Sequence, residues 1–152
     1  MLRESINDAM KSAMKSQEKL RLSTLRLVNA AIKNADIEAR TGGKGPLADD
    51  DLLGLLQKMI KQRQESVELY QKGNRADLVA QEQGEIEIIS AYLPKQMAES
   101  EIAETVAALV RETGATAMKD MGRVMAAIKE RYAGKLDVGK ASAAVKKLLS
   151  GG

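Results

Sequence analysis

The stretch MKDMGRVMAAIKERYAGKLDVGKASAAVKKLL, from Met118 to Leu149, is the part of the sequence that indicates most clearly how this chain folds. Its apolar positions recur every three or four residues, which is the spacing of one face of an α-helix. Gly134 is placed to end a first helix, and Asp137 is suited to cap a second one. The expected core faces are Met118, Met121, Met125, Ile128 and Tyr132 in the first helix, and Val138, Ala141, Val145 and Leu148 in the second.

The same periodicity extends over the rest of the chain. It predicts helices over about 2–16, 20–40, 49–73, 74–93 and 99–112. Asn74 is expected to cap the helix that follows it, with Asp77 three residues on, whereas Gly84 in the middle of that helix costs about 1 kcal/mol. No strand pattern is visible, and no repeat occurs at the periods of solenoid proteins.

Pro94 is the strongest break in the pattern, because proline cannot continue a helix and disfavours helical geometry in the residue before it. The domain boundary is therefore expected between Pro94 and Ala98. The fold class predicted is all-α, with an N-terminal region of about four helices over 1–96 and a small three-helix domain over 97–152.

Charge is distributed unevenly along the chain. From Met118 to the end, eight cations face three anions, a surplus of +5. The remainder of the 24 cations and 21 anions is 16 against 18, a net charge of −2. Such segregation favours a polyanionic partner, and nucleic acid is the first candidate.

The candidate nucleic-acid-binding residues lie on the outward faces of the last two helices. At ~100° per residue, the cations fall away from the expected core, and Gly122 adds a bare strip that a phosphate can approach. The alternative is an ordinary solvated helix face, which carries Lys and Arg without any ligand. The predicted site residues are Lys119, Gly122, Arg123, Lys140, Lys146 and Lys147.

Other charged clusters have simpler explanations. Arg26, Lys33 and Arg40 share one flank of the 20–40 helix, where an ordinary solvated stripe is favoured over a second RNA or partner contact. The acidic run 49–51 is best explained as a complement to a helix N-terminus rather than as metal ligands or an acid/base pair.

Missing residue types restrict the chemistry. The chain has neither Cys nor His, which excludes thiolate nucleophiles, zinc–thiolate sites and imidazole bases. We therefore expect no catalytic residues, no metal site and no cofactor. No segment approaches the ~20 apolar residues of a membrane span, so the sequence predicts a soluble, cytoplasmic protein without a membrane partner.

Several segments together closely resemble the YqeY-like proteins. The C-terminal ones are AYLPKQMAESEI (Ala91 to Ile102) and KDMGRVMAAIKERYAGKLDVGKASAAVKKLL (Lys119 to Leu149). The upstream ones are LRLSTLRLVNAAIKNADIE (Leu20 to Glu38) and LLQKMIKQRQESVELYQKGNRADLVAQEQGEIEII (Leu55 to Ile89), so the resemblance covers nearly the whole chain.

This resemblance implies an all-helical protein of two parts. Its C-terminal part is similar to the tail domain of the GatB subunit of glutamyl/aspartyl-tRNA amidotransferase, a domain associated with holding tRNA. The helices that carry the six candidate residues would be the counterpart of the RNA-facing surface. The resemblance does not extend to the ATP-dependent catalytic body of the GatB subunit or to the glutaminase subunit.

Three functions follow as expectations. The first is a non-catalytic, tRNA-binding helical protein. The second is an accessory role in amidotransferase chemistry, a carbon–nitrogen ligation with glutamine as amide donor. The third is a helical adaptor that binds another protein through the helices at 20–40 and 49–73. Neither the particular tRNA nor the oligomeric state follows from the sequence.

Overall fold

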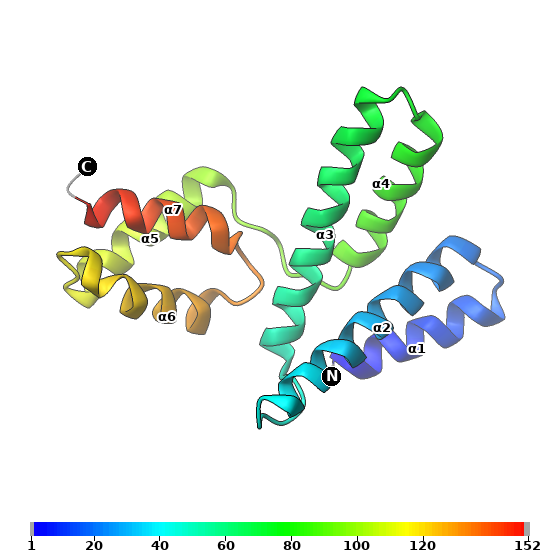
Figure 1. The fold of residues 1–152 in the computed structure, drawn as a ribbon, viewed down its shortest axis with the longest axis horizontal. Helices are drawn as coiled ribbons and strands as arrows, with labels where there is room; N and C mark the ends of the chain where they lie inside the picture. Colours follow the sequence, from blue (N-terminus) through cyan, green and yellow to red (C-terminus); the bar gives the residue numbers. More distant parts are fainter. Residues whose placement is uncertain (1, 151–152) are drawn as a thin grey trace. The chain divides into compact units, whose positions relative to one another are not determined.

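The computed structural model describes residues 2–150, and over that range the chain folds as α-helices with one short 3-10 helix and no strand, which confirms the all-α class (Figure 1). It divides after Leu93 into two compact units, the second beginning at Pro94. The first unit holds α1 (Leu2–Lys15), α2 (Lys19–Thr41), α3 (Asp49–Lys72) and α4 (Ala76–Ser90). The second holds α5 (Glu99–Thr113), the 3-10 helix η1 (Met118–Asp120), α6 (Met121–Tyr132) and α7 (Val138–Leu149).

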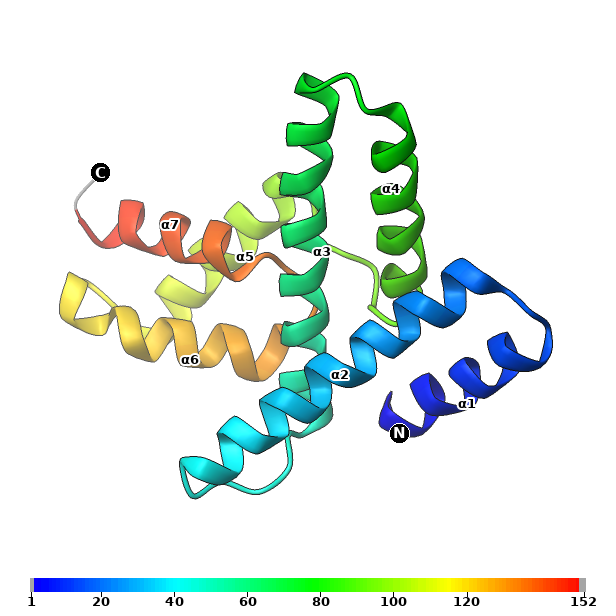
Figure 2. The same ribbon diagram turned by 45° about the vertical axis from the view of Figure 1, so that its right-hand side comes forward.

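The first unit is held together by one apolar core to which all four helices contribute. In each helix the buried side chains recur at helical spacing, as in the Leu25, Val28 and Ile32 series of α2. The α3 helix pairs with α4, and α1 pairs with α2, as two hairpins (Figures 1 and 2). The core consists of Ile6, Leu25, Val28, Ile32, Leu52, Leu56, Met59 and Ile89.

The start of α4 differs from the prediction. Asn74 has a left-handed backbone with φ of 56°, and Arg75 is the residue at the cap position. Asp77 lies in the first turn of α4, as the sequence suggested, and its carboxylate also accepts hydrogen bonds from the Arg75 guanidinium at 3.3 and 3.2 Å. The predicted cap at Asn74 is therefore wrong, because asparagine also suits the left-handed turn that ends α3.

Gly84 has a packing role that its propensity does not show. A Cβ atom at this position would lie 2.8 Å from Cδ2 of Leu20, which is closer than carbon atoms pack. Helix α4 contacts α2 here, so glycine gives the two helices room to approach. The cost in helix propensity is offset by this contact.

The second unit has a separate core between α5, α6 and α7. Val106, Val124 and Val145 are fully buried in it, one from each helix. Figures 1 and 2 both show α6 and α7 side by side and running in opposite directions. Within the unit, the segment after Pro94 is tied to the α6–α7 loop: the Gln96 side chain donates to the carbonyl of Gly134 at 2.6 Å, and Met97 N–H donates to the carbonyl of Lys135 at 2.8 Å.

The predicted core faces of the last two helices need correction. Met118 is 42% exposed and Leu148 is 43% exposed, whereas Val124 and Leu149 are buried. Val138 is also exposed. A 3-10 turn precedes α6, and its three residues per turn put Met118 out of phase with the α-helix that follows.

Across residues 2–150, none of the helices combines the length and the apolarity that crossing a bilayer requires.

Candidate nucleic-acid interface

The structure brings five of the six predicted residues to one end of the second unit. Lys119 lies in η1, and Gly122 and Arg123 lie in the first turn of α6. Lys146 and Lys147 form the last turn of α7. Because α6 and α7 run in opposite directions and η1 contacts α7, these turns are neighbours.

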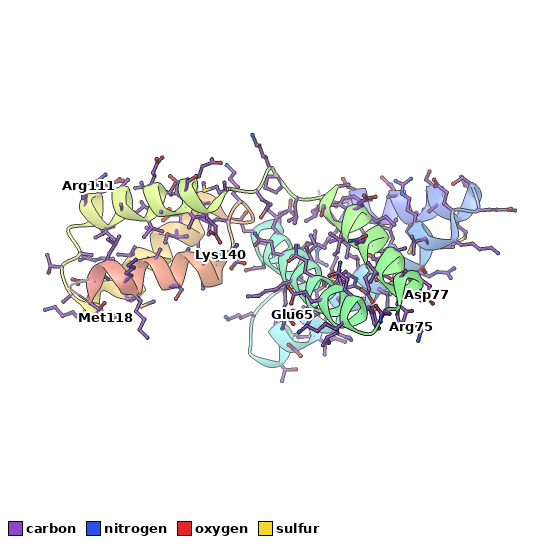
Figure 3. All side chains as sticks on the ribbon, turned by 90° about the horizontal axis from the view of Figure 1, so that it is seen from above. Glu65, Arg75, Asp77, Arg111, Met118 and Lys140 are labelled. Atoms are coloured by element: carbon purple, nitrogen blue, oxygen red, sulfur yellow. The ribbon has the colours of Figure 1, made fainter. Side chains whose placement is uncertain are left out.

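Lys140 lies apart from the other five residues. It stands in the first turn of α7, and Figure 3 shows it at the opposite end of the unit from Met118. Its Nζ lies 3.0 Å from Oε1 of Glu99, the first residue of α5. This hydrogen bond raises the pKa of Lys140 and keeps its charge compensated.

The charge of Arg123 is also compensated, by a carboxylate at the start of the same helix. Its Nη2 lies 3.2 Å from Oδ1 of Asp120. The Asp120 carboxylate accepts hydrogen bonds from the N–H groups of Thr116 and Ala117, at 3.0 and 3.2 Å, and these bonds lower its pKa. Arg123 and Lys140 each have a carboxylate partner in the local structure, which weakens the field of these two cations.

The other three predicted cations differ from Arg123 and Lys140 because none of them has a carboxylate partner among the described residues. Lys119, Lys146 and Lys147 are exposed, and within residues 2–150 no carboxylate lies in ion-pair range of their ammonium groups. Gly122 beside them is exposed too, and a Cβ atom at this position would meet no atom within 4 Å apart from its own neighbours and the backbone of its own helix. This cluster, which we call the basic end, consists of Lys119, Gly122, Lys146 and Lys147.

The unit as a whole is less basic than the sequence window that begins at Met118. From Pro94 on, ten cations face seven anions, a net charge of +3, and the first unit is neutral with 14 of each. The difference comes from α5, which contributes Glu99, Glu101, Glu104 and Glu112. Charge is therefore segregated inside the unit, with an acidic α5 and basic α6 and α7.

Two further residues of the region do not stand out in the sequence. Arg131 pairs with Glu112 of α5 through two bonds of 2.8 and 2.7 Å, which lower the pKa of Glu112 and remove another cation from the surplus. Lys129 lies exposed in the last turn of α6 with no ion pair to any described residue. It follows the buried Val124 by five residues and the buried Ile128 by one, about 140° and 100° around the helix, and this spacing would have placed it off the core face.

The exposed side chains of the basic end are suited to electrostatic contact with an anionic ligand. Among the described residues, no three carboxylates come close enough together to hold a metal ion. Tyr132, the aromatic residue of this unit, packs against the core and is half-buried. What the surface offers to a ligand is a set of exposed ammonium groups beside a short stretch free of bulky side chains.

Fold and charge together define the class: a small all-helical protein of two units, the second with a basic end. The chain belongs to the YqeY-like family, whose family model, described as "Yqey-like protein", matches residues 3–149. This finding confirms the resemblance seen in the sequence, while the similarity to the amidotransferase tail stays a prediction.

Fungal relatives support the same family. The protein named "Altered inheritance of mitochondria protein 41, mitochondrial" of Pyrenophora tritici-repentis is 36% identical over 128 residues, 80% of this chain and 68% of that protein. Its namesake in Lachancea thermotolerans is 41% identical over 105 residues, 68% of this chain and 54% of that protein. In Saccharomyces cerevisiae the identity is 35% over 94 residues, 61% and 49% respectively. The chain thus spans about half to two thirds of the length of these relatives.

The names of these relatives overturn the cytoplasmic location expected from the sequence, because each of them is called mitochondrial. The expectation rested on the lack of an apolar membrane-spanning run. That lack does not distinguish one aqueous compartment from another, so it was not a sound basis for naming the cytoplasm.

Proposed function

We propose that this protein is a non-catalytic RNA-binding protein that holds tRNA through the phosphate backbone at the basic end of its second unit. The observation that carries the proposal is the meeting of Lys119, Lys146 and Lys147 from η1 and α7, all exposed and none ion-paired with a described residue. The resemblance to the tail of the amidotransferase GatB subunit favours tRNA over other polyanions.

The physical basis is release of counterions from the nucleic acid. Each lysine that neutralises a phosphate frees condensed cations, which gives an affinity that depends on salt and not on sequence. Stacking on bases contributes little, since Tyr132 packs against the core. A folded RNA, whose phosphates are held in fixed positions, suits such a surface better than a flexible single strand.

The test is charge reversal at the basic end, with a matched control in the first unit. The triple variant Lys119→Glu, Lys146→Glu, Lys147→Glu is expected to lose at least roughly a hundredfold in tRNA affinity near 0.1 M salt, from about five- to eightfold per contact. The control, Lys58→Glu, Lys61→Glu, Lys72→Glu, changes the net charge equally at three exposed positions of α3 and is expected to bind nearly as the wild type does.

Fluorescence anisotropy with labelled tRNA measures both variants, and circular dichroism checks that their helix content is unchanged. Equal losses in the two triple variants would show that total charge alone governs binding. A wild-type protein without measurable binding at low ionic strength would refute the proposal.

An adaptor role is a second candidate, because α2 and α3 expose large apolar side chains. Leu27 and Ile37 of α2 are 48% and 58% exposed, and Leu69 of α3 is 67% exposed. Exposed apolar side chains mark a protein interface where they form a continuous patch, whereas single ones are common on any surface. Co-purification of a stoichiometric protein that survives nuclease treatment would favour this role over RNA binding.

A further inference from the structure

The last two helices carry the same short sequence twice. DMGRVMAAIKE from Asp120 to Glu130 and DVGKASAAVKK from Asp137 to Lys147 align at an offset of 17 residues, with Asp, Gly, both Ala and the first Lys identical. A cation follows the glycine in both copies, as Arg123 and Lys140. This period is shorter than that of a solenoid repeat, so it does not appear at solenoid spacings.

Burial confirms that the two copies are equivalent in structure. Val124 and Ala141 are both fully buried, and Ile128 and Val145 are 1% and 0% exposed. Equivalent residues of the two copies are alike in being buried, half-buried or exposed at every position except Met121, which is half-buried where Val138 is exposed. The repeat therefore describes two helices that pack on their core with the same face and present the same face to solvent.

The two copies of the repeat are related by an approximate two-fold rotation, because the helices that carry them are antiparallel. Because α6 and α7 lie side by side and run oppositely, each residue of one copy has its equivalent at the other end of the helix pair (Figures 1 and 2). Lys129 in the last turn of α6 and Lys146 in the last turn of α7 are such equivalents.

Each copy carries two equivalent cations, and they differ in whether a carboxylate neutralises their charge. The first is ion-paired in both copies, Arg123 with Asp120 at 3.2 Å and Lys140 with Glu99 at 3.0 Å. The second, Lys129 or Lys146, has no ion pair to a described residue. Six residues at ~100° each put the first and second cation about 120° apart around the helix, so Lys146 does not share the side of α7 on which Lys140 meets Glu99.

We propose that Lys129 and Lys146 are equivalent contacts to two phosphates of one nucleic-acid backbone, so that binding extends along the α6–α7 pair from the basic end to the last turn of α6. This inference rests on the proposed RNA-binding function and adds Lys129 as a binding residue. Lysine in a last turn also complements the helix dipole. The test must therefore measure binding and stability separately.

The first experiment compares single substitutions in the full chain. Lys129→Ala and Lys146→Ala are each expected to lower tRNA affinity about five- to eightfold at 0.1 M salt, equally within about twofold, and each to reduce the slope of log affinity against log salt by about 0.7–0.9. The double variant is expected to show twice the change in slope. Arg111→Ala, an exposed cation of the acidic α5, serves as the control and is expected to change little.

The second experiment adds a charge where the copies differ. Glu130 occupies the position of Lys147, and Glu130→Lys completes the repeat on the exposed side of α6. We expect it to raise tRNA affinity and to steepen the salt dependence. Glu104→Lys makes the same change in net charge at an exposed position of α5 and is expected to have the smaller effect.

The outcomes separate this inference from the function on which it rests. Wild-type binding that weakens with Lys146→Ala and not with Lys129→Ala overturns the equivalence and leaves RNA binding standing. Equal gains from Glu130→Lys and Glu104→Lys overturn it as well, because only net charge would matter. Absence of wild-type binding refutes the function itself. Thermal denaturation of each variant shows whether a loss reflects unfolding, and a variant unfolded at the assay temperature is replaced by the corresponding Lys→Gln change.

Discussion

At the residue scale, one carboxylate joins three parts of the first unit. Asp36 of α2 accepts hydrogen bonds from both terminal nitrogens of Arg3 on α1, each at 2.7 Å, and from the backbone N–H of Leu47 at 3.0 Å. Arg3 also donates to the carbonyl of Leu47. The Arg3 guanidinium, with help from the Leu47 N–H, holds the pKa of Asp36 at about 2, below its usual 3.8. The loop before α3 is thereby fastened to the first two helices.

The shifted pKa makes this contact sensitive to acid. The unfolded carboxyl binds a proton near pH 3.8 and the folded one near pH 2, so its contribution to stability is present above pH 3.8 and is lost as the pH falls toward 2. Asp36→Asn should lower the free energy of unfolding at pH 7, and the gap from the wild type should narrow between pH 4 and pH 2. Urea denaturation at several pH values measures this gap. A gap that stays constant down to pH 2 would show that the carboxylate charge is not the cause.

At the element scale, a buried ion pair links α3 to α4. Arg63 Nε lies 2.9 Å from Oε2 of Glu85, with 14% and 8% of the two side chains exposed, and Arg63 also donates to the carbonyl of Met59. Burial, together with the charge of the neighbouring Glu85, raises the pKa of Glu82. Arg63 thus sits between two helices as the cation that offsets a local excess of negative charge.

Removal of one partner should cost more than removal of both. Arg63→Met leaves Glu85 buried without its cation and is expected to destabilise the protein by about 3 kcal/mol, and Glu85→Leu by a similar amount. The double variant is expected to lose clearly less than the sum, because no uncompensated charge remains. A double-mutant cycle in urea gives the coupling. Additive losses would mean that the pair acts only through packing.

Helix positions could be predicted from the sequence, whereas several local details could not. Periodicity and the breaks at Gly134 and Pro94 are local signals, and the helices follow them closely. The close approach of Gly84 to Leu20 and the pairing of Lys140 with Glu99 join residues far apart in sequence. No pattern within one helix contains such information. The burial of Met118 was mispredicted for a different reason. It lies in a 3-10 turn, whose three residues per turn place it on a different side from the core face of the α-helix that follows.

The candidate site illustrates the same limit. The sequence identified the basic helices, and the predicted domain over 97–152 already contained the four glutamates of α5, but a charge count that begins at Met118 leaves them out. The sequence could not show that Arg123, Arg131 and Lys140 are ion-paired. A sum of charges over a whole segment also does not show that Lys129 and Lys146 occupy equivalent positions in their two helices. That equivalence is readable in the sequence once the two helices are aligned at their buried positions.

At the scale of the whole molecule, the two units have separate cores and different charge. The first is neutral, and the second carries a net charge of +3 that is concentrated on η1, α6 and α7. Four of these cations, Lys119, Lys129, Lys146 and Lys147, are exposed and have no ion pair to a described residue. Because the proposed RNA contact uses these four lysines, we expect it to neutralise about four phosphates.

The most direct measurement is the tRNA affinity of the full chain over a range of salt concentrations. With about four phosphate contacts at roughly 0.7–0.9 each, the slope of log affinity against log salt is expected to lie between about −2.8 and −3.6. Binding that does not change with salt, or no binding at low ionic strength, would contradict recognition of the RNA backbone by this surface.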